Sequence, residues 1–177
     1  MKTAEVLEPG EVSSGFYYMS WRKGGPGIGI PINFSFAAGM EGNLEMGIDL
    51  PIFFNYVQGE LRFQFMRESG ILPAATVGGI GGMEFFQSTP YPIWLGIRGV
   101  VSKKISILTV YGGASISTFP EFDNYVGIAL PNLRFFSWHI EIQNRYGAET
   151  LYGSDFQWWQ SINAGMVIRF HRPAFLG

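Results

Sequence analysis

The sequence predicts an all-β chain that closes into an antiparallel, up-and-down barrel of about ten strands. Three observations predict this fold: a hydrophobic period of two, turn residues at regular intervals, and a composition poor in charge. Among 177 residues, charged residues make up 15%, aromatic residues 16%, and there are 24 glycines. Soluble domains carry about 25% charged residues. The composition therefore favours a chain whose surface does not face only water.

The alternation is clearest between Val57 and Phe65, where odd positions are apolar or glycine and even positions are Gln, Glu, Arg and Gln. The stretch 134–145 repeats the pattern, with Phe136 and Trp138 on one face and Ser137 on the other. Segments 30–36 and 161–170 alternate in the same way. Successive side chains of a strand point to opposite faces, and helical spacing fits these segments less well.

Clusters of Gly, Pro, Asn and Asp divide the chain into segments of strand length. We expect strands at 11–22, 28–39, 43–50, 56–67, 74–86, 92–102, 105–118, 124–130, 132–146 and 157–170. The segment 124–130 is short, and without it nine strands remain. It is kept because single-chain bacterial barrels have an even number of strands. Barrels of eight or twelve strands are the alternatives.

The connections between these segments alternate in length. Longer loops are expected at 22–27, 87–92, 119–123 and 148–156. Tighter turns are expected at 41–43, 68–73, 102–104 and 131–132. Such an alternation is typical of a membrane barrel with short turns at one end and longer loops at the other.

The apolar face of the strands is expected to meet lipid. If it filled a soluble core, the opposite face would meet water and be rich in Lys and Glu. That face instead carries Gln, Ser, Asn, Thr and Gly with few charges of both signs. The sequence contains no run of about 18 apolar residues that would form a transmembrane helix. A closed barrel is the other structure that satisfies its backbone in a bilayer. The alternative is a soluble, lipocalin-like barrel.

The segment from Asn163 to Phe170 resembles the C-terminal sorting motif of small bacterial outer-membrane β-barrel proteins. In that motif a polar residue is followed by glycine, a hydrophobic residue and a final aromatic residue, at positions that match Asn163, Gly165, Ile168 and Phe170. The resemblance implies residence in the bacterial outer membrane and recognition by the barrel-assembly machinery. His171 to Gly177 follow the aromatic residue here, whereas the family usually stops there.

The resemblance also suggests a division of the chain. Residues 1–10 are expected to form an N-terminal periplasmic extension, 11–170 the transmembrane barrel, and 171–177 a C-terminal extension. The start of the chain, Met1 to Val6, has no basic region followed by an apolar run. We therefore expect a signal peptide to be absent from this sequence.

The sequence offers little material for catalysis or cofactor binding. It has no cysteine and two histidines, His139 and His171. Outer-membrane lipases place a His two residues before a Ser, but Glu141 stands at that position after His139. His139 and Glu141 share one face of the predicted strand. They could form an acid–base pair or belong to a polar network in the interior, and the network is favoured. No enzyme activity, metal or cofactor is expected, and a net charge of −2 without a basic run excludes a nucleic-acid partner.

The charged residues on the polar face are expected to line the lumen. Both signs occur in similar number, and buried charges need partners. A barrel of about eight strands is filled by side chains, so ten strands favour a plugged lumen. The sequence therefore predicts a structural or interaction barrel, with a narrow pore for ions or small solutes as the alternative. A protein partner or homo-oligomer is left open. The predicted lumen network consists of Glu45, Asp49, Glu60, Arg62, Glu84, Arg98, His139, Glu141, Arg145 and Arg169.

Overall fold

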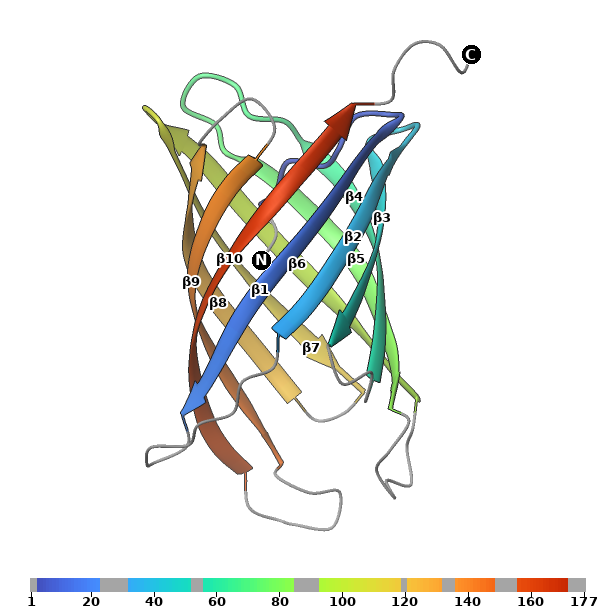
Figure 1. The fold of residues 1–177 in the computed structure, drawn as a ribbon, viewed down its shortest axis with the longest axis vertical. Helices are drawn as coiled ribbons and strands as arrows, with labels where there is room; N and C mark the ends of the chain where they lie inside the picture. Colours follow the sequence, from blue (N-terminus) through green and yellow to red (C-terminus); the bar gives the residue numbers. More distant parts are fainter. Residues whose placement is uncertain are drawn as a thin grey trace.

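The computed structural model describes residues 3–22, 32–51, 56–84, 93–118, 121–131, 136–148 and 156–171. Within them, ten antiparallel strands form one closed barrel, in which each strand pairs with its chain neighbours and β1 pairs with β10 (Figure 1). The strands are β1 (Glu11–Arg22), β2 (Ile32–Met40), β3 (Leu44–Pro51), β4 (Tyr56–Met66), β5 (Ala74–Glu84), β6 (Ile93–Ile105), β7 (Leu108–Ser117), β8 (Glu121–Pro131), β9 (Phe136–Ala148) and β10 (Phe156–His171). The predicted fold class is confirmed.

The short segment 124–130 is part of a full strand. β8 runs from Glu121 to Pro131 and pairs with β7 and β9 along its length. The loop predicted at 119–123 is therefore shorter than expected, since Glu121 to Asp123 belong to the strand. Of the loops predicted at 22–27, 87–92 and 148–156, residues 22, 148 and 156 belong to strands, and the remaining residues, like 119 and 120, lie outside the described residues.

The turn predicted at Ser102–Lys104 was misplaced. β6 continues to Ile105, with Lys103 paired to Val110 and Lys104 to Thr109, and the turn lies at Ser106–Ile107. Polar residues continue the ladder here because the strand ends project into water. Ser106 reverses the chain with a φ of 58°. The turn predicted at 41–43 is confirmed, with positive φ at Gly42 and Asn43. These turns and residues 67–73 define the short-turn end of the barrel, and the opposite end is called the loop end.

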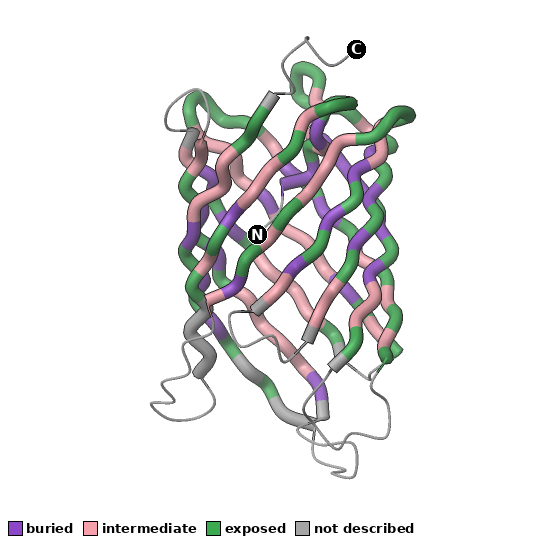
Figure 2. The backbone as a smooth tube through the Cα atoms, turned by 45° about the vertical axis from the view of Figure 1, so that its right-hand side comes forward, coloured by how far each residue is buried: buried purple, intermediate pink, exposed green. Residues whose placement is uncertain are grey.

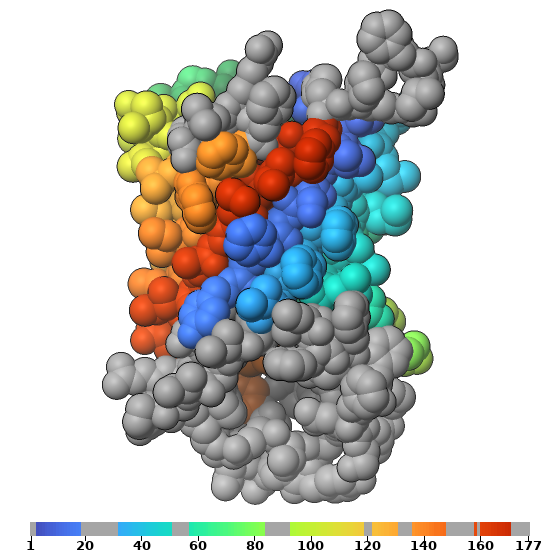
Figure 3. All heavy atoms as spheres, in the orientation of Figure 1, coloured from blue at the N-terminus to red at the C-terminus, as the bar shows by residue number. Residues whose placement is uncertain are grey.

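The wall has two chemically different faces, visible as alternating exposed and buried positions in Figure 2. Outward positions carry large apolar side chains that are exposed, such as Phe63, Leu95, Val126, Ile140 and Ile162. In the coloured part of the face shown in Figure 3, the side chains of β1, β2 and β10 lie against one another without a break between strands. No described helix is long and apolar enough to cross a bilayer. A largely apolar exterior of this extent fits lipid.

Residues 3–10 are called the N-terminal segment, and residues 3–8 of it lie inside the barrel (Figure 1). Thr3, Ala4 and Leu7 are buried, and Ala4 packs against Ala74 and Val100 of the wall. The sequence suggested a periplasmic extension over residues 1–10. The structure instead folds residues 3–8 back into the lumen, and the turn at 9–10 leads out into β1.

A glycine on β2 makes room for this segment. A Cβ atom added at Gly39 would lie 2.0 Å from the carbonyl oxygen of Glu8 and 2.5 Å from that of Leu7. Real Cβ contacts are never so short, so any side chain here would displace the N-terminal segment. The wall is therefore shaped to hold that segment against β2.

Candidate functional site

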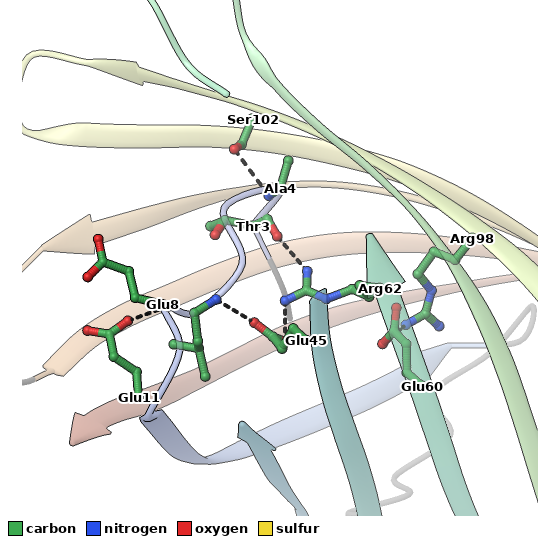
Figure 4. Close-up of polar contacts among 10 residues, drawn as sticks. Thr3, Ala4, Glu8, Glu11, Glu45, Glu60, Arg62, Arg98 and Ser102 are labelled. Atoms are coloured by element: carbon green, nitrogen blue, oxygen red, sulfur yellow. Dashed lines mark hydrogen bonds and ion pairs between the residues drawn. The ribbon is translucent and has the colours of Figure 1, made fainter. Parts of the chain in front are cut away.

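The lumen at the short-turn end is organised around one buried guanidinium. Arg62 on β4 donates from Nη1 to the carbonyl oxygen of Thr3 at 2.7 Å and from Nη2 to the carboxylate of Glu45 (Figure 4). Glu45 and Arg62 are opposite each other in the β3–β4 ladder, and their side chains are 3% and 4% exposed. The other Glu45 oxygen, Oε2, accepts from the backbone N–H of Leu7 at 3.0 Å. One ion pair thus binds the N-terminal segment at two points.

Other strands bind the same segment through its backbone. The N–H of Ala4 donates to Ser102 Oγ on β6 at 3.1 Å. The N–H of Glu8 donates to Glu11 Oε2 at 2.8 Å, and the N–H of Glu11 returns a bond to the carbonyl oxygen of Glu8 at 2.9 Å. Buried backbone groups need partners, and an irregular segment has none of its own. The side chains of the wall supply them.

Two further ion pairs follow along the lumen towards the loop end. Arg98 Nη1 on β6 lies 3.2 Å from Glu60 Oε2 on β4 (Figure 4), with side chains 16% and 1% exposed. Arg145 Nε on β9 lies 3.1 Å from Asp123 Oδ1 on β8. The Arg145 side chain is 38% exposed. The charged side chains of the lumen are therefore buried at Arg62 and more exposed to water at Arg145.

Amides and aromatic rings fill the opposite side of the lumen. Asn163 Nδ2 on β10 donates to Glu141 Oε1 at 3.0 Å and to Gln143 Oε1 at 3.3 Å. The ring of Tyr111 is buried, with its centroid 5.8 Å from that of His139. These contacts hold the interior faces of β7, β9 and β10 together.

A Ser–His pair is present, and the part of the chain that the structure describes gives it no third group of a catalytic triad. Ser137 Oγ and His139 Nε2 share a hydrogen bond of 2.8 Å. A nucleophilic Ser needs a base that a further group orients. Among the described residues, His139 Nδ1 has no hydrogen-bond partner, and Glu141 bonds to Asn163 instead. The described residues also contain no group of three or more His, Asp or Glu side chains placed to hold a metal.

The structure brings most of the predicted lumen residues together. Glu45, Asp49, Glu60, Arg62, His139 and Glu141 are buried, and Arg98 and Arg145 are half-buried. Arg169 is exposed, beside a cavity at the short-turn end. The side chain of Glu84 lies outside the described residues. Sequence reasoning missed Thr3, Ala4, Leu7 and Ser102, because no periodic pattern marks the N-terminal segment or links it to β6.

A small cavity lies between the N-terminal segment and the wall. It measures about 40 Å³ and is lined in part by Thr3, Glu5, Arg62, His139 and Arg169. A water molecule needs roughly 10–15 Å³ of such space. This cavity therefore has room for a few water molecules.

The residues of the predicted assembly signal lie on both faces of β10. Asn163 and Gly165 are buried on the lumen side, and Phe170 is half exposed on the outside. Ile168 is half-buried on the outer face. A Cβ atom at Gly165 would lie 2.5 Å from Tyr17 Cβ, so glycine allows β1 and β10 to close the barrel. Asn163 and Gly165 therefore contribute to the folded barrel itself, independently of any recognition of β10 by the assembly machinery.

A small charge cluster at the short-turn end gives a pH-dependent prediction. Glu68 accepts from the backbone N–H of Lys104 at 3.0 Å and lies 3.1 Å from Lys103 Nζ. The Lys104 N–H, with Lys103, holds the pKa of Glu68 below its usual 4.5. A lowered carboxyl pKa stabilises the fold above the unfolded value, and that stabilisation is lost as pH falls through the folded value. Glu68→Gln should therefore lower the free energy of unfolding by less than about 1 kcal/mol at pH 7. Denaturant titrations should show the difference from wild type shrink as the pH falls through the lowered pKa of Glu68, and a constant difference would contradict it.

Comparison with solved structures gives likenesses in fold at low sequence identity. A de novo designed transmembrane β-barrel is 13% identical, with 93% of this chain and 99% of that chain covered and a TM-score of 0.39. Neisserial surface protein A is 11% identical, with coverages of 90% and 96% and a TM-score of 0.38. The attachment invasion locus protein Ail of Yersinia pestis is 13% identical, with coverages of 92% and 99% and a TM-score of 0.30. No family model and no curated protein sequence matches the chain.

The class of the protein follows from its own surfaces. A closed ten-stranded antiparallel sheet with an apolar exterior and a polar, charge-paired interior defines a transmembrane β-barrel of the outer-membrane type. Because an open sheet edge or a lipid-facing loop would leave backbone groups unsatisfied, closure is what allows these strands to cross a bilayer.

Proposed function

We propose that this protein is a non-conducting outer-membrane barrel, closed by its own N-terminal segment and acting in a structural or interaction role. The observation that carries the proposal is the seating of residues 3–8 in the lumen, where Arg62, Glu45 and Ser102 bind their backbone. No cofactor is required. Any contact with another molecule is made by the exterior or by the two ends of the barrel.

The polar network supports closure because its members depend on one another. Removing the N-terminal segment leaves Glu45 without the Leu7 N–H and Arg62 without the Thr3 carbonyl. Unsatisfied buried groups cost about 1–3 kcal/mol each, and more when they are charged. Release of the segment therefore costs free energy when few water molecules in the lumen can replace these hydrogen bonds.

A narrow pore for ions or small solutes is the second candidate. Its support is the gradient of exposure along the lumen, from Arg62 at 4% to Arg145 at 38%, which brings water into the loop end. A conducting state would need the N-terminal segment to leave its seat. The two functions are distinguished by the ion conductance of the purified barrel in planar lipid bilayers, with and without residues 1–8. Steady conductance of the unmodified protein would contradict the plugged barrel.

The lipid bilayer is one partner of this barrel, and we propose the barrel-assembly machinery as another, through the last strand. Phe170→Ser is expected to abolish assembly in cells while leaving refolding into detergent close to wild type. Phe63→Ser on β4 is the matched control, since Phe63 and Phe170 are outward-facing and 44% and 50% exposed. The measurement is the fraction of heat-modifiable, folded protein on gels. Equal losses for the two variants in cells would show that Phe170 acts through the lipid-facing surface alone.

A further inference from the structure

A long groove crosses the outer face of the barrel over the strands β1 to β6 (Figure 1). Its volume is about 1170 Å³, and its lining extends from Val12 of β1 and Phe170 of β10 to Leu95 of β6. Val12 and Phe170 lie at the short-turn end of their strands, and Leu95 lies near the loop end of β6. The groove therefore descends from the short-turn end into the membrane-spanning wall.

Glycines lower the floor of this groove at its centre. Gly59 of β4 and Gly81 of β5 are paired across the ladder, and Gly79 lies two residues before Gly81 on the same face. Large apolar side chains flank them, because Ile48 is paired with the glycine of β4 and Leu95 with Gly81. The floor is therefore formed by backbone, and the walls are formed by apolar side chains.

The fold itself leaves room for side chains at two of these glycines. A Cβ atom added at Gly79 would have no neighbour within 4 Å, and one at Gly59 would meet only carbonyl oxygens at 3.9 and 4.0 Å. Neither glycine has a positive φ, and the β4–β5 register has no shift between Tyr56 and Gln64, so no bulge requires them. Glycine weakens a strand interior, and one of its uses there is to let a ligand approach the backbone closely. The open space favours an occupant from outside the chain.

The chemistry of the lining restricts what that occupant is. The outward side chains of the groove are apolar apart from the hydroxyl of Ser14. Glu60 also borders the groove, but its carboxylate points into the lumen and pairs with Arg98. Peptide groups placed in such a groove would have no hydrogen-bond partners, which is costly. The groove therefore fits a flexible hydrocarbon and does not fit a polypeptide segment.

The length of the groove matches one leaflet of a bilayer. A row of cross-strand pairs follows it through Ser14, Phe36, Ile48, Gly59, Gly81 and Leu95. Its five steps of about 4.8 Å give a path of about 24 Å. Strands of such barrels tilt by about 40°, so a path perpendicular to them descends by about 15 Å. The hydrocarbon core is about 30 Å thick, and half of it is the depth of one leaflet.

We propose that this groove binds one acyl chain of a phospholipid from the leaflet on the short-turn side. The groove is continuous with the lipid-facing exterior, since Phe36, Met46 and Leu61 on its walls belong to the exposed apolar surface. The acyl chain lies over the glycines of β4 and β5, where its atoms contact the backbone and the flanking side chains. This site is on the outside of the wall and does not depend on whether the lumen is plugged.

Filling the floor of the groove tests the proposal. Gly59→Val with Gly79→Val places two side chains where the fold has space for them, and valine suits a strand. The matched control is Gly99→Val, because Gly99 is an exposed glycine of β6 with equally open space and does not line the groove. Heat-modifiable migration establishes that each variant folds.

Retained lipid is measured by native mass spectrometry, after each barrel is refolded into phosphatidylcholine vesicles and extracted into detergent. The wild-type and Gly99→Val barrels should retain one phospholipid each. The filled variant should retain about tenfold less, because the acyl chain loses its packing contacts with the floor. No lipid on the wild type, or equal retention by the filled variant, would overturn the proposal. A wild-type dimer that the filled variant converts to monomers would assign the groove to a second barrel and overturn it too.

The headgroup of the lipid provides a second test. Because no charged side chain points into the groove, retention should be the same from phosphatidylcholine as from phosphatidylglycerol vesicles. Retention of phosphatidylglycerol alone would show that a basic side chain elsewhere on the barrel holds the lipid by its phosphate, and the acyl-chain site would be wrong.

Discussion

Deleting residues 1–8 is expected to convert a non-conducting barrel into one that conducts ions in discrete steps. The deletion removes the buried residues Thr3, Ala4 and Leu7 from the lumen, where a cavity of about 40 Å³ already lies beside Thr3 and Leu7. Water then reaches Arg62 and Glu45 from the short-turn end, and the lumen becomes continuous along those residues. Current recordings in planar bilayers at fixed voltage measure the effect.

The open lumen is also expected to prefer cations. Among the described residues, the Arg145–Asp123 pair balances itself. The other buried and half-buried charges of the lumen are two guanidiniums, Arg62 and Arg98, and four carboxylates, Glu45, Asp49, Glu60 and Glu141. A lumen lined by one sign of charge concentrates the opposite ion. Reversal potentials in a salt gradient report this preference.

The control for the deletion is Glu8→Gln. Glu8 is exposed, and it joins the segment to β1 through its backbone N–H and carbonyl groups, so the plug should stay seated and the barrel silent. A deletion variant that folds, as judged by heat-modifiable migration, and yet stays silent would show that wall side chains alone close the lumen. The N-terminal segment would then be a lining and not a plug.

The faces of the strands were predictable from the sequence, because alternation reports local backbone geometry. The even positions of Val57 to Phe65 predict an inward Glu60 and Arg62, and the structure buries both. A strand needs only its own pattern to assign inside and outside. The segment 124–130 was too short for its own pattern to decide, and it was predicted as a strand because such barrels have an even number of strands.

It was harder to predict from the sequence which lumen residues pair with each other. Pairing depends on the register of the strands and on strands that are not neighbours in sequence. Glu45 meets Arg62 only because the β3–β4 ladder places them opposite each other. Glu60 meets Arg98 from β4 and β6, two strands apart. The bonds of the N-terminal segment join residues 59 and 98 positions apart, and its irregular backbone leaves no period to detect.

Arg62→Ala is expected to be the most destabilising single substitution in the lumen, lowering the free energy of unfolding by about 3–5 kcal/mol. The change leaves the Glu45 carboxylate, 3% exposed, without its cation, and leaves the Thr3 carbonyl without its donor. Denaturant unfolding in lipid vesicles measures the loss. Water that enters to solvate Glu45 should also appear as a new cation-selective conductance in planar bilayers.

Two further variants separate loss of the ion pair from loss of a long side chain. Arg67→Ala removes an arginine at the exposed short-turn end that bonds to Asn43, and should cost less than about 1 kcal/mol. Glu45→Leu with Arg62→Met replaces both charges by apolar groups of similar size, and should be closer to wild type than Arg62→Ala, since no buried charge is left unpaired. If the double variant is as unstable as the single one, Arg62 stabilises the barrel through its bond to Thr3 and not through Glu45. If Arg62→Ala costs no more than Arg67→Ala, the pair is solvated in the folded barrel and the lumen is not dry at this point.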